Sequence, residues 1–217
     1  MRRGVALAVF MLLLLTALLP LRLALEWAGA QRALSAARVE GTVWHGRLQD
    51  ARLRGLSLGD AALSLDLLSL LGGRIGFRFI AYGALAGDGV ASPDALRAGS
   101  LRFPLRAFSP NLPLDGELQL TGLDIAFRDG ACRRAQGSAR VVRAQLADGV
   151  TLPPDFALRG ALGCAGKEAV LRLMGVGDGV EIASVLRLAA DGAWRLESRI
   201  SAQGRAMTRV DRGSLAL

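Results

Sequence analysis

Cys132 and Cys164 are the two cysteines of this chain and the residues best suited to covalent chemistry. Cysteine pairs usually form disulfides in oxidising compartments, whereas in reducing ones they more often bind metals or stay free. His45 is the sole histidine, so no second histidine or cysteine stands near either thiol to complete a zinc site. If the chain is exported, we therefore expect a structural disulfide between these two residues. Two buried free thiols are the alternative.

Other chemistry finds little support in the sequence. His45 lacks the partners that a metal site or a catalytic triad requires, and no G-x-x-x-x-G-K-[ST] loop is present to bind phosphates. We therefore expect no α/β-hydrolase nucleophile, no enzymatic activity, no metal and no cofactor. Several aspartates directly precede a glycine, a pairing that turn geometry explains without a calcium or carboxylate site. They are Asp88, Asp115, Asp129, Asp148, Asp178 and Asp191.

An apolar run at the N-terminus determines the compartment that we expect for the rest of the chain. It begins at Gly4, ends at Leu21 and follows Arg2 and Arg3. A helix of about 18 apolar residues can cross the hydrocarbon core of a bilayer, and basic residues before it favour a cytoplasmic N-terminus. We therefore expect residues 1–3 in the cytoplasm and a single transmembrane helix over residues 4–25. The rest of the chain would lie across the membrane, in an oxidising compartment for a bacterial host.

A cleaved signal peptide is the alternative interpretation of this segment. Signal peptides have an apolar core of about 7–15 residues and a small-x-small cleavage site, and Ala28-Gly29-Ala30 matches such a site. However, the apolar run is longer than that core, and Arg22 and Trp27 suit the membrane interface. We therefore favour a retained anchor, and either interpretation exports the remainder of the chain.

The net charge of +8 raises the question of nucleic-acid binding. Lys167 is the only lysine, so arginine supplies nearly all of the positive charge. Nucleic-acid sites usually combine clustered basic residues with interleaved aromatics, whereas arginines here stand singly in strand-like segments. We therefore expect a solvated strand face, no nucleic-acid partner, and some attraction to anionic membrane lipid. These arginines include Arg52, Arg54, Arg78, Arg143, Arg172 and Arg187.

Beyond residue 37 the sequence alternates like a series of short strands. The clearest hairpin lies over residues 180–200, where apolar and charged residues alternate on both sides of Asp191-Gly192. The alternation changes parity at Gly122, which predicts a β-bulge or a tight turn. We expect an all-β fold in which a curved antiparallel sheet, trough-like or open and barrel-like, follows the transmembrane helix.

Two segments interrupt the alternation. Residues 67–73 are apolar on both parities, which predicts a buried strand or a short helical turn. Three prolines over residues 104–113 predict a loop, because proline removes strand donors. This loop would separate an N-terminal β lobe over residues 38–103 from a C-terminal β lobe over residues 114–203. Residues 204–217 show no pattern and are expected to be disordered.

A short motif brings a known family into view. Residues 41–48 read G-T-V-W-H-G-R-L, and they lie between the apolar run and the leucine-rich residues 67–73. In this order, and with the two later cysteines, the chain resembles the protein N family of type II secretion systems over roughly residues 1–200. We expect Trp44 to anchor the core or the lobe interface and His45 to face solvent. The motif residues are Gly41, Thr42, Trp44 and Gly46.

The resemblance implies a non-enzymatic accessory subunit that spans the inner membrane once and has a periplasmic β domain. Its partners would be other inner-membrane proteins of the type II secretion system, bound through edge strands and exposed faces. The resemblance also implies kinship with trough-like domains involved in lipid transport. The alternative function is a periplasmic lipid-handling protein with an apolar β trough, which the one-sided strands and the small apolar side chains favour. The sequence does not indicate an oligomeric state.

Overall fold

The structure is a computed structural model that describes most of the chain from residue 18 to residue 214. The described residues are 11, 18–27, 34–53, 56–66, 76–92, 94–107, 114–146, 152–153, 156–202 and 205–214. They form a 14-stranded antiparallel sheet with one short α-helix and one 3₁₀ turn. The prediction of an all-β antiparallel fold is confirmed.

The helix α2 spans Leu21–Trp27 and precedes all of the strands. The strands are β1 Leu34–Ser35, β2 Arg38–Thr42, β3 His45–Leu53, β4 Leu56–Leu65, β5 Phe77–Tyr82, β6 Ala86–Ser92, β7 Ala95–Pro104, β8 Leu114–Arg128, β9 Ala131–Leu146, β10 Leu158–Ala165, β11 Glu168–Gly177, β12 Val180–Leu188, β13 Ala193–Ala202 and β14 Arg205–Ser214, and the 3₁₀ turn η2 spans Leu105–Ala107.

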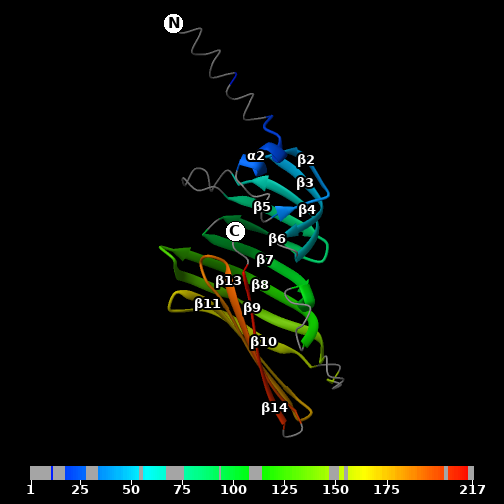
Figure 1. Cartoon of the computed structure of the whole chain (residues 1–217), viewed down its shortest axis with the longest axis vertical. Coiled ribbons are helices and arrows are strands. Elements are labelled where there is room, and N and C mark those ends of the chain that lie inside the picture. The colour runs from blue at the N-terminus through cyan, green and yellow to red at the C-terminus, as the bar shows by residue number, and fades with distance from the viewer. Residues whose placement is uncertain are drawn as a thin grey trace.

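The strands follow one another through the sheet in sequence order. β1 and β2 both pair with β3, and each later strand pairs with the next one in the chain. Figure 1 shows this meander along the long axis, with β2 to β5 at one end and β10 to β14 toward the other. The sheet is open, because among the described strands β14 pairs only with β13 and does not return to the first strands.

The proline-rich segment that was expected to separate two lobes joins two paired strands. β7 pairs directly with β8 across residues 104–113, and Pro104 itself lies opposite Glu117. The proline-rich segment is therefore a connection within one continuous sheet. Pro110 and Pro113 lie outside the described residues.

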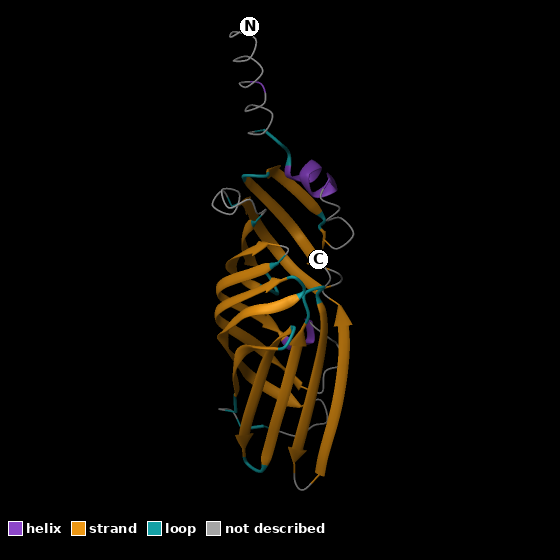
Figure 2. Ribbon diagram, turned by 90° about the vertical axis from the view of Figure 1, so that its left-hand side faces the viewer, coloured by secondary structure: helices purple, strands orange, loops and turns teal. Residues whose placement is uncertain are grey.

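Bulges bend the long central strands. The register shifts between Thr121 and Asp124 in the β8–β9 ladder, and Gly122 lies in that shift with a φ of 64°. The bulge predicted at Gly122 is therefore confirmed. A second shift follows Asp88 in the β6–β7 ladder. Because bulges increase local twist and bend a strand, these shifts let the sheet curl, as the view in Figure 2 shows.

The Asp-Gly pairs occupy two kinds of position. Asp129-Gly130 and Asp178-Gly179 are hairpin turns in which both residues have positive φ, as a type I′ turn requires. Asp88-Gly89 and Asp115-Gly116 lie inside β6 and β8 instead. The hairpin predicted over residues 180–200 is confirmed as β12 and β13, with Leu188 opposite Trp194.

The curled sheet buries apolar side chains on its inner face. One cluster joins Phe103 of β7 and Val141 of β9 to Leu158, Leu171 and Ile182 of the later strands. Since β7 and β12 are far apart in the strand order, this cluster exists because the sheet folds over its own inner face. A second cluster around Leu123 and Ile125 lies beside it. The C-terminal part of the predicted trough is therefore filled by side chains where these clusters lie.

The N-terminal end has a separate small core. Leu21 of α2 is 1% exposed and packs with Leu48 and Ala51 of β3. Pro20 forms an isolated bridge with Thr42 just before the helix starts. The last five residues of the expected transmembrane helix over residues 4–25 are therefore placed differently in the structure. Residues 21–25 belong to a seven-residue helix that packs on the sheet.

Most of the expected anchor lies outside the described residues, which include only residues 11 and 18–25 of it. Within the described part of the chain, no helix has the length and apolar content needed to cross a membrane. Residues 67–73 also lie outside the described residues, so the strand or helical turn predicted there stays a prediction.

The structure has a strand within residues 204–217, the segment for which the sequence predicts disorder. Arg205–Ser214 forms β14, which pairs with β13 from Ala202↔Arg205 to Ala193↔Ser214. The sequence R-A-M-T-R-V-D-R-G-S has weak alternation by itself. It is a strand because β13 supplies a complete ladder of backbone partners.

Candidate interaction surfaces

The G-T-V-W-H-G motif forms the hairpin between β2 and β3. Gly41 lies opposite Gly46 and Thr42 lies opposite His45, so Val43 and Trp44 form the turn. Gly41 has a φ of 86°, and a Cβ there would overlap the carbonyl oxygen of His45. Only glycine accepts this conformation at low cost.

Gly46 and Val43 connect the motif to the N-terminal segment. A Cβ on Gly46 would overlap Cδ2 of Leu21, so the glycine makes room for α2 against β3. The amide of Val43 donates a 3.0 Å hydrogen bond to the carbonyl of Leu19, and its carbonyl accepts one of 2.8 Å from Leu65. The motif therefore joins the segment before α2 to the sheet.

The two large side chains of the motif lie as follows. Trp44 stands in the turn rather than in a strand and is half-buried. His45 is exposed at the start of β3, as expected. Among the residues that the structure describes, no group of three or more histidine, cysteine and carboxylate side chains is suited to a metal ion.

Replacing Gly41 by alanine should destabilise the N-terminal hairpin. An L-residue at positive φ costs roughly 1–2 kcal/mol, and the overlap with the backbone of His45 adds to this. We expect a loss of about 2 kcal/mol or more in the free energy of unfolding, measured by urea denaturation. Gly130→Ala is the matched control, since its φ of 70° imposes similar strain but no atom lies within contact of the added methyl. Equal losses in both variants would contradict the role of the His45 contact.

Cys132 and Cys164 are joined by a disulfide in the structure, with their Cα atoms 5.7 Å apart. Cys132 is 8% exposed at the start of β9, whereas Cys164 is exposed near the end of β10. The amide of Cys132 also donates a 3.0 Å hydrogen bond to the carbonyl of Lys167 in the β10–β11 turn. The disulfide therefore links the first strand pair of the C-terminal half to the next hairpin.

The disulfide lies beside a short ladder between two long strands. β9 and β10 share only the register from Leu158↔Val141 to Ala161↔Ser138. Beyond Ala161, β10 keeps its partners on β11 but has none on β9 in the described ladder. We call this β9–β10 junction the seam. The disulfide closes its far end, which the sequence alone did not indicate.

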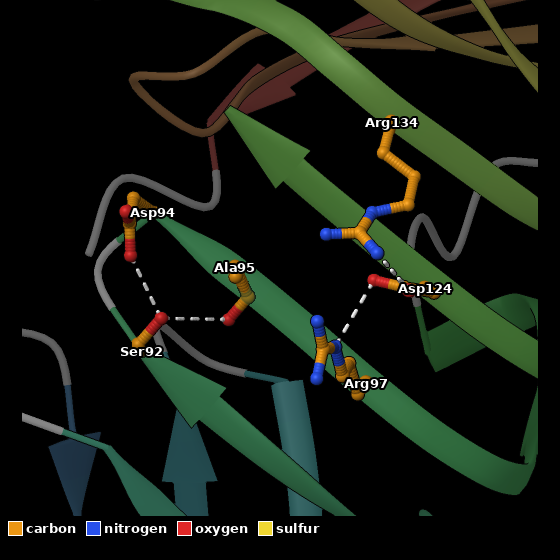
Figure 3. A network of polar contacts seen from close by, with 6 residues as sticks. All are labelled: Ser92, Asp94, Ala95, Arg97, Asp124 and Arg134. Carbon is orange, nitrogen blue, oxygen red and sulfur yellow. Dashed lines mark hydrogen bonds and ion pairs between the residues drawn. The ribbon is translucent and has the colours of Figure 1, made fainter. Parts of the chain in front are cut away.

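A network of charges covers the outer face of β7, β8 and β9 (Figure 3). Asp124 lies directly opposite Arg97, whose Nε is 3.3 Å from Oδ1. On its other side, Nη1 of Arg134 is 3.2 Å from Oδ2 of the same carboxylate. At the neighbouring turn the hydroxyl of Ser92 donates a 2.8 Å hydrogen bond to Asp94.

Replacing Asp124 by asparagine tests this network. Exposed ion pairs are worth about 0.2–1 kcal/mol each, so losing both should lower the free energy of unfolding by about 1 kcal/mol. The loss should shrink in high salt because screening already weakens the pairs of the native protein. Chemical denaturation by urea at low and high salt measures both effects, and a loss independent of salt would contradict an ionic origin.

Two hollows adjoin these features. One of about 400 Å³ borders the charge network and is lined by Arg78, Asp88 and the glycines of the bulges. The other, of about 530 Å³, lies between α2 and the strands β1 to β3, with Arg22, Leu25 and Leu48 in its lining. Both are open to the surface rather than enclosed by the inner face of the sheet.

One further sequence motif, which the sequence analysis did not identify, is typical of hydrolases. Residues 55–59 read G-L-S-L-G and so match the G-x-S-x-G pattern of hydrolase nucleophiles. That pattern requires a sharp turn from a strand into a helix. Ser57 instead lies inside β4, so this serine lacks the structural context of a nucleophile.

The free edge of β14 is another accessible feature. In the described sheet, β14 pairs with β13 on one side and has no strand on the other. Arg209 and Asp211 lie 3.3 Å apart on this strand, at positions opposite Ser198 and Leu196. Because Ser198 is buried, this charge pair faces the inner side of the sheet, a device that limits uncontrolled edge pairing.

These features define an all-β protein built as a single curled sheet, with its accessible groups on the outer face and edges. The family model described as "Type II secretion system (T2SS), protein N" matches residues 32–211. The chain belongs to this family, and the resemblance seen in the sequence is confirmed.

A curated relative and the solved structures complete the comparison. The chain is 29% identical over 143 residues to a type II secretion system protein N of Vibrio cholerae. This match covers 59% of the chain and 56% of the relative, so the chain spans little more than half of that protein's length. No solved structure matches the chain.

Proposed function

We propose that this chain is a non-enzymatic accessory subunit of a type II secretion apparatus, placed at the inner membrane with its sheet in the periplasm. The observation that carries the proposal is the family match over residues 32–211. That range begins before β1 and extends into β14, so it includes nearly the whole described sheet.

The N-terminal segment supports membrane placement. The apolar run begins at Gly4 and is long enough for a transmembrane helix. Leu21 then packs on β3 immediately after Pro20, so the folded body starts where the run ends. The Cys132–Cys164 disulfide supports an oxidising compartment such as the periplasm.

The sheet supports a role in protein contacts. In the described sheet β14 has no strand on its outer side, so a partner's strand could add there, a common mode of protein recognition. The outer face adds exposed charged side chains. Partners of this subunit would be other inner-membrane proteins of the secretion system.

Co-purification tests the proposal. The tagged full-length chain is expressed in its own host, membranes are solubilised gently, and bound proteins are identified by mass spectrometry. We expect inner-membrane secretion subunits to elute with it, and an unrelated inner-membrane protein with the same tag serves as the control. If a known secretion subunit recovers its neighbours and this chain recovers none of them, the proposal fails.

The alternative is a periplasmic lipid-handling protein. It is supported by the one-sided strands and by half-buried apolar residues on the inner face of the last strands, such as Leu186 and Ile200. Against it stand the buried clusters that fill the described inner face. Mass spectrometry of lipids extracted from the purified chain separates the two: lipid at near-unit stoichiometry favours the alternative, and its absence disfavours it.

A further inference from the structure

Arginines that are scattered along the sequence come together on the outer face of the sheet. Arg140 of β9 lies directly opposite Arg159 of β10. Arg140 also lies opposite Gln119 of β8, and Gln119 in turn lies opposite Arg102 of β7. On the other side of β10, Arg172 of β11 lies opposite Ala161, which is the next residue after Arg159 on the outer face of β10. All four arginines are exposed. We call them the arginine patch.

The arginine patch opposes folding. Residues directly opposite on neighbouring strands have Cβ atoms about 5 Å apart, and like charges at such positions are destabilising. Among the described residues, none of the four arginines of the patch has an ion-pair partner. Glu117, two residues before Gln119 on β8, accepts a 2.8 Å hydrogen bond from Gln119 and lies 3.8 Å from Arg143.

The arginine patch differs from the charge network on the same face. In the network, Arg97 and Arg134 share the carboxylate of Asp124 (Figure 3), so the fold neutralises its own arginines. In the described part of the chain, the arginine patch has no such compensation. Its positive charge is therefore available to an acidic group from outside the chain.

Exposed apolar side chains border the patch. Met174 lies directly opposite Arg159 and is 59% exposed, and Val176 on the same face of β11 is 76% exposed. Arginine and methionine are both enriched at protein interfaces, and guanidinium groups bind carboxylates in paired hydrogen bonds. We propose that the arginine patch with Met174 is a docking surface for an acidic surface of another protein. The docking surface depends on the proposed function only in one respect: if that function is correct, the acidic partner is another protein of the secretion system.

The geometry favours a protein over a lipid bilayer as the occupant. The patch extends from β7 to β11 on the face opposite the buried Leu118, Val141 and Leu158. Because the sheet curls (Figure 2), a flat bilayer would touch only part of this outer face. A protein surface can follow this curvature.

Charge reversal provides the test, with the full-length chain in detergent micelles and fluorescent poly-L-glutamate as the acidic probe. Arg159→Glu should weaken binding about fivefold, because an attraction becomes a repulsion. The same change should raise the folding equilibrium constant about twofold to fivefold, because the introduced carboxylate would then face Arg140. A gain in stability with a loss of binding is a result that a structural role for Arg159 would not produce.

Two further variants keep the interpretation specific. The double variant Arg140→Glu with Arg159→Glu places two negative charges opposite each other, so its stability should stay near that of the unmodified chain. Its binding of polyglutamate should fall by about tenfold or more. Arg212→Glu is the control, because Arg212 is exposed on β14 opposite Arg195 and its reversal makes the same change in net charge away from the patch. It should alter binding by about twofold or less.

Three outcomes would overturn the proposal. The first is no binding of polyglutamate at low salt, and the second is equal weakening by Arg159→Glu and Arg212→Glu. The third uses vesicles of phosphatidylglycerol and phosphatidylcholine: if the double reversal prevents vesicle binding but leaves polyglutamate binding intact, the patch serves lipid. Because these assays use purified protein, their failure is separate from the co-purification result, which tests the proposed function itself.

Discussion

Replacing both Cys132 and Cys164 by serine is expected to lower the free energy of unfolding by about 3–4 kcal/mol. The two cysteines are 32 residues apart, and a crosslink across a loop of this size restricts the unfolded chain by that amount in the chain-entropy model. Urea denaturation of the double variant measures the loss. The unmodified protein with reductant is the matched control and should behave like the variant.

The position of the seam predicts which residues lose local stability when the disulfide is removed. β9 and β10 are paired only from Leu158↔Val141 to Ala161↔Ser138, and the disulfide holds the strands together beyond that ladder. Hydrogen exchange should therefore accelerate most over residues 132–137 and 162–167 when the disulfide is removed. Unchanged stability with uniform exchange would contradict this role of the disulfide.

Replacing Leu158 by alanine is expected to cost about 2–5 kcal/mol. Leu158 is 0% exposed and lies opposite Val141, which is also 0% exposed, at the paired end of the seam. Large-to-small changes at such sites remove apolar contacts and leave a cavity. Leu162→Ala is a suitable control because Leu162 is only partly buried on the same strand. We expect it to lose clearly less stability in the same urea titration.

A double-mutant cycle connects the two predictions. Leu158 and the disulfide hold opposite ends of one junction, so their losses should not be additive. Once one end has opened, the other contributes less to holding β10 on β9. Strictly additive losses would indicate that the seam does not open as a unit.

Local patterns predicted the elements of this fold well. Alternation over residues 180–200 predicted β12 and β13, and the parity change at Gly122 predicted the bulge in β8. These features depend on side-chain period and on backbone preferences, which neighbouring residues determine. The motif from Gly41 to Gly46 was also visible, although its close contact with Leu21 was not.

Pairing between strands determined the features of the fold that the sequence did not predict. The prolines over residues 104–113 predict a loop, but they do not reveal that β7 pairs with β8 across it. Residues 204–217 have no strand pattern of their own, but β13 provides the partner that makes Arg205–Ser214 a strand. A strand gains its backbone hydrogen bonds from another segment, so its formation cannot be judged from its own residues alone.

By itself, the sequence determined the antiparallel β character, the apolar N-terminal run, the two cysteines and the family motif. Only the tertiary structure decided that the cysteines close the seam and that Arg140 faces Arg159. The physical reason is register: alternation tells which face a side chain occupies, whereas the pairing of strands determines which distant residue stands beside it.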